Sequence, residues 1–202
     1  MKIKKITQSF SDEFSVNTYV IIDNQDCIII DPGMVSEELK EMITCLNLKF
    51  VLLTHGHYDH TGGLNDLNST VYINKGELII LKNSEYNYSK MFNDKINLSN
   101  TKIVPFQDKE IINFNDIKIR TLSTPGHTKG SSCFFIDNYA FTGDTLFVDN
   151  VGRTDLFSGD TKTLYKSIES LKKHLKDNTM ICPGHGGRAK YSVVKKKNPY
   201  IK

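Results

Sequence analysis

The sequence lacks a long apolar run, a secretory leader pattern and a strong excess of one charge. No hydrophobic run approaches the roughly 20 residues that span a bilayer, and the first ten residues show neither an apolar stretch nor a small-residue cleavage site. The 26 basic residues nearly balance the 23 acidic ones, which argues against a nucleic-acid partner. We therefore expect a cytoplasmic protein with no membrane or nucleic-acid partner.

The four cysteines lack the CxxC spacing of zinc and redox motifs. Three of the four (Cys27, Cys45, Cys133 and Cys182) lie in apolar runs, where a reduced core thiol is expected. The chain also has no GxSxG motif and no Ser-His-Asp arrangement. The sequence thus argues against a disulfide scaffold and against covalent catalysis.

The length of 202 residues suits one domain with a substantial core. We expect a single domain over residues 1–202, because 39% hydrophobic and 24% charged residues are typical of globular proteins. The one local excess of charge lies in a basic C-terminal segment, residues 188–202. A solvated tail is the simplest expectation for such a run.

Short β-branched runs predict strands, and apolar residues at helical spacing predict helices. The expected strands are residues 3–10, 17–23, 27–30, 50–53, 71–73, 117–122, 131–136, 139–142 and 180–182. Helices are expected at 36–46 behind an N-cap serine, near 76–81 and at 161–175. Residues 83–100 show no clear period and are expected to form a loop or a loose helical insertion. This mixture predicts an α+β fold with two sheets flanked by helices.

Three of the six histidines fall in one short motif, Thr54-His55-Gly56-His57-Tyr58-Asp59-His60, directly after an expected strand. Imidazole and carboxylate are natural ligands of Zn²⁺ and Fe²⁺. His55 and His57, two residues apart, can point to one ion. Asp59 and His60 can turn, at the start of the next helix, towards a second ion. The motif therefore predicts a metal site.

Three later residues follow apolar runs in turn contexts: His127 in TPGHT, Asp144 in TGDT and His185 in PGHG. Together with the first motif they complete two sets of three protein ligands and one shared carboxylate, which is what a binuclear hydrolytic site needs. Asp31, which also follows a strand, is either an acceptor that fixes a ligand histidine or a simple turn residue. We expect no function for His174, which lies among lysines on the last helix.

The stretches THGHYDH, TPGHT, GDTLF and PGHG, in this order, resemble the metallo-β-lactamase superfamily and its short, single-domain glyoxalase II-like hydrolases, from about residue 17 to residue 200. The resemblance implies a four-layer αββα sandwich with the site at one edge of the two sheets. It implies two metal ions, the first held by His55, His57 and His127, the second by Asp59, His60 and His185, with Asp144 bridging them.

A water molecule shared by two divalent cations has its pKa lowered from about 15.7 to about 7. We therefore expect a metal-bridging hydroxide as the nucleophile, with Asp59 as a catalytic residue that orients it. Zn²⁺ is the expected ion, although the same ligands accept Fe²⁺ or Mn²⁺. The expected substrate is a small anionic acyl thioester such as S-lactoylglutathione.

The resemblance also implies substrate contacts. Arg153 falls where glyoxalase II has a basic residue that meets the anionic end of its substrate, and Lys195 and Lys196 belong to a similar basic stretch. Glyoxalase II proper has an added C-terminal helical region that helps to bind glutathione, whereas this chain ends 17 residues after His185. The thiol carrier therefore stays open. Residues 83–100 are either a lid over the substrate or ordinary surface packing.

Other functions fit the same residues. A persulfide dioxygenase-like enzyme would hold a single Fe²⁺ with His55, His127 and Asp144, although the Thr145-Leu146-Phe147 continuation favours the hydrolases. A lactonase or a true β-lactamase is a further alternative, because specificity lies in the loops. A binding module with structural zinc is disfavoured, since such zinc is usually closed by four protein ligands, often thiolates.

Overall fold

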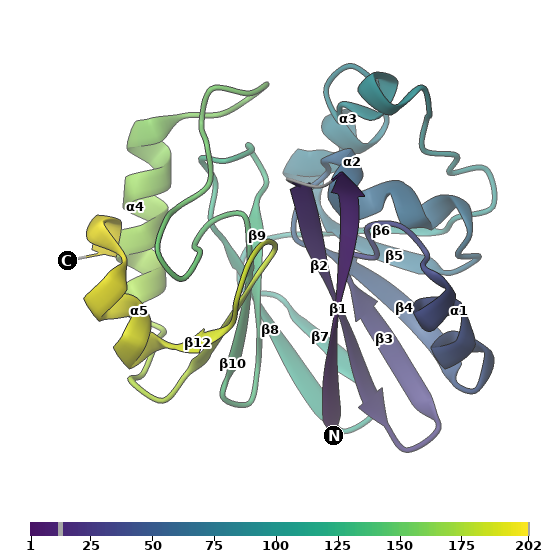
Figure 1. The fold of residues 1–202 in the computed structure, drawn as a ribbon, viewed down its shortest axis with the longest axis horizontal. Helices are drawn as coiled ribbons and strands as arrows, with labels where there is room; N and C mark the ends of the chain where they lie inside the picture. The colour runs from purple at the N-terminus through teal and green to yellow at the C-terminus, as the bar shows by residue number, and fades with distance from the viewer. Residues whose placement is uncertain (12–13, 202) are drawn as a thin grey trace. The chain divides into compact units, whose positions relative to one another are not determined.

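The computed structural model describes residues 1–11 and 14–201, and the chain divides into two compact units. The first comprises Met1–Ile73 and Leu78–Phe106, and the second comprises Asn74–Glu77 and Gln107–Lys202. Each unit is built on one six-stranded sheet with accompanying helices (Figure 1). The α+β class predicted from the sequence is confirmed, while the expectation of a single domain stays a prediction.

The first sheet has its strands in chain order, an antiparallel meander followed by parallel strands. The strands are β1 (Lys2–Ser11), β2 (Phe14–Asp23), β3 (Asp26–Ile30), β4 (Asn47–Leu53), β5 (Thr70–Asn74) and β6 (Ile103–Phe106). Because β3, β4 and β5 run parallel, the residues that follow β3 and β4 leave the sheet at the same edge. The HxHxDH motif follows β4.

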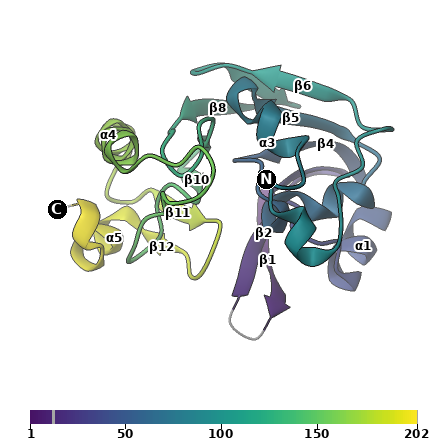
Figure 2. The same ribbon diagram turned by 90° about the horizontal axis from the view of Figure 1, so that it is seen from above.

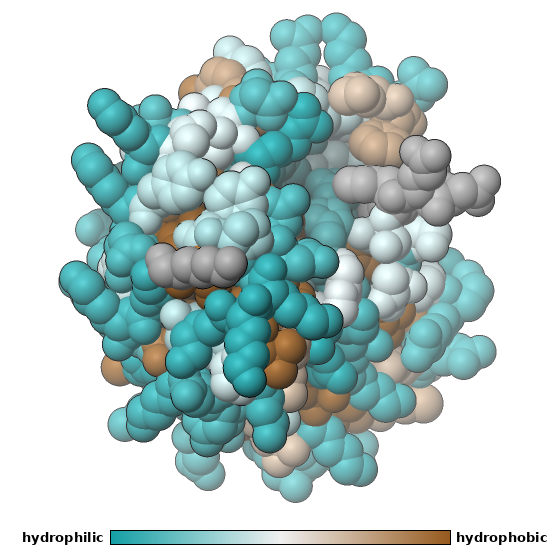
Figure 3. All heavy atoms as spheres, turned by 60° about the vertical axis from the view of Figure 1, so that its left-hand side comes forward, coloured by the Kyte–Doolittle hydropathy of each residue, from teal (hydrophilic) through white to brown (hydrophobic). Residues whose placement is uncertain are grey.

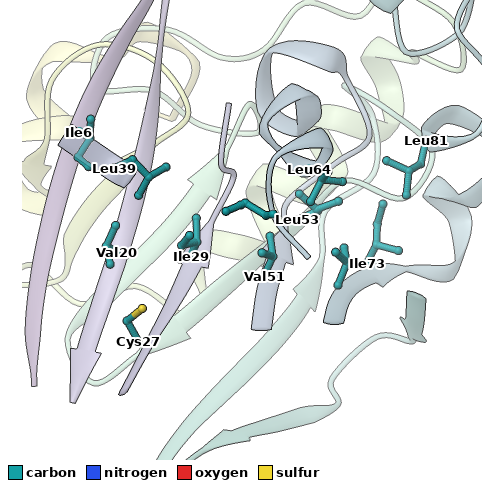
Figure 4. Close-up of a cluster of buried hydrophobic side chains, with 12 residues drawn as sticks. Ile6, Val20, Cys27, Ile29, Leu39, Val51, Leu53, Leu64, Ile73 and Leu81 are labelled. Atoms are coloured by element: carbon teal, nitrogen blue, oxygen red, sulfur yellow. The ribbon is translucent and has the colours of Figure 1, made fainter. Parts of the chain in front are cut away.

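The helices of the first unit are short: α1 (Glu37–Thr44), α2 (Tyr58–Thr61) and α3 (Leu78–Leu81), with 3₁₀ turns at Gly62–Asn65 and Ser89–Phe92. Helix α1 begins where the side chain of Ser36 accepts a hydrogen bond from the backbone N–H of Leu39, as expected for an N-cap serine. Its buried face meets a cluster of aliphatic side chains from β1 to β5 (Figure 4). Burial of this cluster holds α1 on the sheet.

The second sheet runs in the order β12-β11-β10-β9-β8-β7. Its strands are β7 (Ile111–Phe114), β8 (Ile117–Ser123), β9 (Ser132–Ile136), β10 (Tyr139–Gly143), β11 (Met180–Pro183) and β12 (Ala189–Lys190). Neighbours are antiparallel except β10 and β11, so that β8, β10 and β11 all run in the same direction. The three strands that precede His127, Asp144 and His185 therefore end at one edge of this sheet.

Helices α4 (Thr161–Lys172) and α5 (Tyr191–Lys197) lie side by side in the second unit (Figures 1 and 2). Leu164, Ile168 and Leu171 of α4 share one buried cluster with Tyr191 and Val194 of α5. The expectation of a solvated C-terminal tail is thus wrong. The lysines of α5 are exposed, but its apolar face is core, and Lys202 lies outside the described residues.

Three strands were not predicted from the sequence: β6, β7 and the two-residue β12. Strand β6 contains Pro105, which cannot donate a ladder hydrogen bond, and it is tolerated because β6 is an edge strand (Figure 2). Strand β7 alternates exposed and buried residues, a pattern too short to stand out. Helix α4 also ends at Lys172, three residues before its predicted end.

No helix in the described part of the chain is long and apolar enough to cross a bilayer. The face drawn in Figure 3 is mostly hydrophilic, and its hydrophobic residues gather only in small separate areas. A large exposed apolar patch, which would mark a membrane or protein contact, is not seen on that face.

Candidate metal centre

In the first unit, Asp31 follows β3 and Thr54 follows β4 at the shared edge of the two parallel strands. The backbone N–H of Asp31 donates to the carbonyl oxygen of Leu52, at 3.0 Å. The Asp31 carboxylate in turn accepts from the backbone N–H of Thr54 at 2.8 Å and from its hydroxyl at 2.6 Å. Parallel pairing thus brings a buried carboxylate to the first residue of the histidine motif.

These bonds determine which nitrogen of each imidazole carries the proton. The single hydroxyl proton of Thr54 goes to Asp31, so the Thr54 oxygen accepts from Nδ1–H of His55, 3.1 Å away. Nδ1–H of His60 donates to Asp31 at 2.9 Å. Both histidines therefore present Nε2 with its lone pair, which is the form that binds a metal ion.

The ligand atoms of the motif lie in pairs. Nε2 of His55 is 3.1 Å from Nδ1 of His57, and Nε2 of His60 is 3.3 Å from Oδ2 of Asp59. His57 ends the loop before α2, whereas Asp59 and His60 lie within α2, so the two pairs come from different backbone conformations. All three histidines are at most 5% exposed.

In the second unit, Asp144 follows β10 and His185 follows the parallel neighbour β11. Their turns are joined by a backbone bond from Gly184 N–H to the carbonyl of Gly143, at 2.9 Å. Oδ2 of Asp144 lies 3.2 Å from Nε2 of His185 and 3.7 Å from Nε2 of His127. Parallel strands again bring ligand residues together at one edge.

The His127 ring is oriented by the backbone of a distant loop. Its Nδ1–H donates to the carbonyl oxygen of Arg153 at 2.8 Å, which leaves the Nε2 lone pair for a metal ion. The preceding residue of that loop, Gly152, passes so close to the Asp144 carbonyl and the His127 ring that a Cβ would clash. The hydroxyls of Thr124 and Thr145 are 2.8 Å apart and link the turn that contains His127 to the turn that contains Asp144.

This donor set fits divalent metal ions. Two nitrogen ligands of one tetrahedral zinc ion lie about 3.3 Å apart, since each Zn–N bond is about 2.0–2.1 Å long. The 3.1–3.3 Å separations within the pairs of the motif, and the 3.2 Å between Asp144 and His185, agree with that spacing. A cation bound between the atoms of a pair would be met by a lone pair from each of them. The His/Asp cluster therefore indicates divalent ions, without deciding between zinc and iron.

The predicted substrate contacts stay predictions. The Arg153 guanidinium forms two 2.7 Å hydrogen bonds with the Asp155 carboxylate, and this pairing lowers the pKa of Asp155 to about 2. Arg153 also lines a pocket of about 310 Å³ with Thr154, Tyr165 and Tyr200. Lys195 pairs with Asp177 and lies over the Tyr191 ring, and Lys196 is exposed.

The 83–100 insertion packs against the histidine motif of its own unit. The backbone N–H of Tyr58 donates to the carbonyl of Asn87 at 2.8 Å, and the Tyr58 hydroxyl donates to Asp94. Burial and this bond raise the pKa of Tyr58. The ring of Tyr88 lies 5.3 Å from that of His57. The role of the 83–100 insertion as a lid stays a prediction.

Sequence reasoning left Asp31 undecided and missed the other orienting groups. The structure shows that Asp31 accepts a hydrogen bond from His60, which is one of the two roles left open, while the role of His60 as a ligand stays a prediction. Thr54 is adjacent to His55 in the sequence, so its hydroxyl is the orienting group that the sequence could most easily have indicated. The Arg153 backbone carbonyl gave no signal, because a main-chain acceptor has no residue type.

Comparisons with known proteins agree with this site. Residues 11–185 match the family model described as the metallo-β-lactamase superfamily. The chain therefore belongs to that superfamily and is a metallo-hydrolase with the predicted metallo-β-lactamase fold. The fold and family expected from the four sequence motifs are confirmed.

Individual relatives support the same placement. The chain is 32% identical to the hydroxyacylglutathione hydrolase GloC of Haemophilus influenzae, with 89% of each chain covered. It is similar to the crystal structure of the BLEG-1 B3 metallo-β-lactamase (TM-score 0.89, 26% identity, all of both chains covered). It also matches the di-iron-bound form of TTHA1623 (TM-score 0.82, 26% identity, 98% and 99% covered).

Proposed function

We propose that this protein hydrolyses a small anionic acyl thioester, of the S-lactoylglutathione type, at a site with two divalent metal ions. One ion would be held by His55, His57 and His127, the other by Asp59, His60 and His185, with Asp144 between them. The observation that carries the proposal is the pairing of ligand atoms at 3.1–3.3 Å within the HxHxDH motif. The similarity to a hydroxyacylglutathione hydrolase supports the thioester as substrate.

Divalent ions, when bound, polarise an acyl oxygen and lower the pKa of water to about 7. Zinc is our first choice for histidine and carboxylate ligands, and the similar protein TTHA1623 was crystallised with two irons. We propose a cytoplasmic location, consistent with the four free cysteines of the described chain.

The residues of the chain have separate tasks in this proposal. The buried Asp31 carboxylate holds His60 and, through Thr54, His55, and so keeps both imidazoles in the ligating tautomer. Asp59, whose side chain is 13% exposed, is accessible enough to accept a hydrogen bond from the attacking water and orient it.

The thiol carrier of the substrate would bind at the pocket beside Arg153. Tyr165 and Tyr200 supply apolar walls, with their rings 6.4 Å apart, and the hydroxyls of Thr154 and Thr161 add polar contacts. A substrate carboxylate would exchange with Asp155 for the Arg153 guanidinium, since both are bidentate acceptors. Lys195 and Lys196 remain proposed contacts of lower priority, because Lys195 is engaged by Asp177.

The test combines metal analysis with turnover. We expect about two metal ions per chain, hydrolysis of S-lactoylglutathione, and loss of both properties in Asp144→Ala. Asp149→Ala removes an exposed carboxylate five residues further along the chain and serves as the control. One iron per chain, with oxygen consumption on a persulfide and no hydrolysis, would replace the proposal with the dioxygenase. Two metals without thioester turnover would retain the metal site and reject the substrate.

A further inference from the structure

Residues 83–97 of the 83–100 insertion contact the histidine motif both before and after Tyr88. Before Tyr88, the buried Asn87 accepts from the backbone of Tyr58, and its side-chain amide donates to the carbonyl of Leu81 at 3.0 Å. After it, Asp94 accepts from the Tyr58 hydroxyl, and the rings of Phe92 and Tyr58 lie 5.2 Å apart. Since Tyr58 stands between His57 and Asp59, the segment is anchored inside the metal motif itself.

The backbone of Tyr88 adopts a conformation that disfavours a large side chain. Its φ of 66° and ψ of 11° lie in the left-handed region, where glycine and asparagine are preferred. The other left-handed residue of the segment, Asn93 (φ 53°), follows that preference. A bulky residue persists in such a conformation only where the surrounding structure determines it.

The ring of Tyr88 contacts His57, which is one of the proposed metal ligands. The Tyr88 ring lies 5.3 Å from the His57 ring at an angle of 64°, an edge-on arrangement that attracts aromatic rings. The His57 ring also meets the ring of His55 at 4.7 Å and 85°. The rotation of the His57 imidazole is thus restricted by a tyrosine 31 positions further along the chain.

We propose that Tyr88 is a positioning residue for metal binding, whose ring holds His57 so that Nδ1 stays beside Nε2 of His55. A ring that is already oriented loses less freedom when the ion binds, which strengthens binding. The inference rests on metal binding alone and not on the thioester substrate. Metal affinity therefore tests it even if the proposed reaction is wrong.

The decisive variants are Tyr88→Phe, which keeps the ring, and Tyr88→Gly, which removes the ring and suits the left-handed backbone. We expect Tyr88→Phe to bind Zn²⁺ like the parent protein, and Tyr88→Gly to bind about three- to tenfold more weakly, in line with one aromatic contact. Competition with a chromogenic chelator measures the affinity. The visible spectrum of the Co²⁺-loaded protein should change when the ring is removed and not in Tyr88→Phe, since it reports the ligand geometry.

Met91→Ala is the matched control, because Met91 lies in the same segment with 78% of its surface exposed. Tyr88→Asn is a second ringless variant that tolerates the backbone, in case the glycine variant does not fold. Parent-like zinc affinity in the ringless variants would overturn the proposal. So would an equal loss in Tyr88→Phe or in Met91→Ala, since either would show that the ring is not the cause.

Discussion

Oδ2 of Asp31 lies 2.9 Å from Nδ1 of His60, although 29 positions separate the two residues in the chain. The contact exists because β3 and β4 are parallel neighbours that end at the same edge. A residue that precedes the histidine motif by more than twenty positions therefore determines which nitrogen of His60 would face a metal ion.

The role of Asp31 can be tested with Asp31→Asn. Asp31 has a φ of 52°, which asparagine tolerates, so the change removes the charge with little strain on the backbone. We expect metal affinity to fall about 10- to 100-fold, as when other partners of ligand histidines are lost. Asp26→Asn, at the start of the strand that Asp31 follows and paired with Lys49, is the control for chelator titration. Equal affinities in both variants would contradict the assigned role.

Because Gly152 lies close to Asp144 and His127, one added methyl group at this position should destabilise the protein. Gly152→Ala would place a Cβ against the Asp144 carbonyl and the His127 ring. We expect a loss of about 1–3 kcal/mol in the free energy of unfolding from overpacking, together with weaker metal binding. Gly187→Ala, where a Cβ meets nothing within 4 Å, should be neutral. Urea unfolding of the two variants measures the difference, and similar midpoints would refute the expectation.

The buried thiols predict a loss of stability at alkaline pH. Burial raises the pKa of Cys27 from 9.0 to about 11 and that of Cys133 to about 12. The unfolded chain releases these protons first, so their contribution is complete below pH 9 and is lost as the pH rises from 9 towards 11 or 12. We expect about 2 kcal/mol lost per thiol by about pH 10.5.

Cysteine variants isolate this effect from other groups that titrate at high pH. The decrease in unfolding free energy between pH 8 and 10.5 should be smaller in Cys27→Ala and Cys133→Ala than in the parent. Cys45→Ala, which removes an exposed thiol, should follow the parent. If all three variants lose stability in parallel with the parent, ionisation of the buried thiols is not the cause.

Adjacent valines in α5 test whether the basic C-terminal segment is part of the core. Val194 is fully buried, whereas Val193 is 38% exposed. Val194→Ala should cost about 2 kcal/mol of unfolding free energy, because two buried methyl groups are lost and a cavity remains. Val193→Ala should change it by less than about 0.5 kcal/mol. Equal and small effects in thermal melts would mean that the segment is not packed as described.

Much of the fold and the site could be predicted from the sequence because the signals are local. Alternating or continuous β-branched runs predicted β1 to β5 and β8 to β11, and the N-cap serine predicted the start of α1. The HxHxDH spacing identified the metal motif, since ligand chemistry depends on residue type. Local signals failed for β6, where Pro105 hid an edge strand, and for α5, whose charged face concealed a buried one.

The sequence by itself thus determined the ligand types, most of the strands and the family. Only the tertiary structure decided which groups orient the ligands: the Asp31 carboxylate for His60, the Arg153 carbonyl for His127 and the Tyr88 ring for His57. The reason is physical. Strand pairing and loop packing bring these groups together across 26 to 31 positions of the chain, and local periodicity carries no information about such distant contacts.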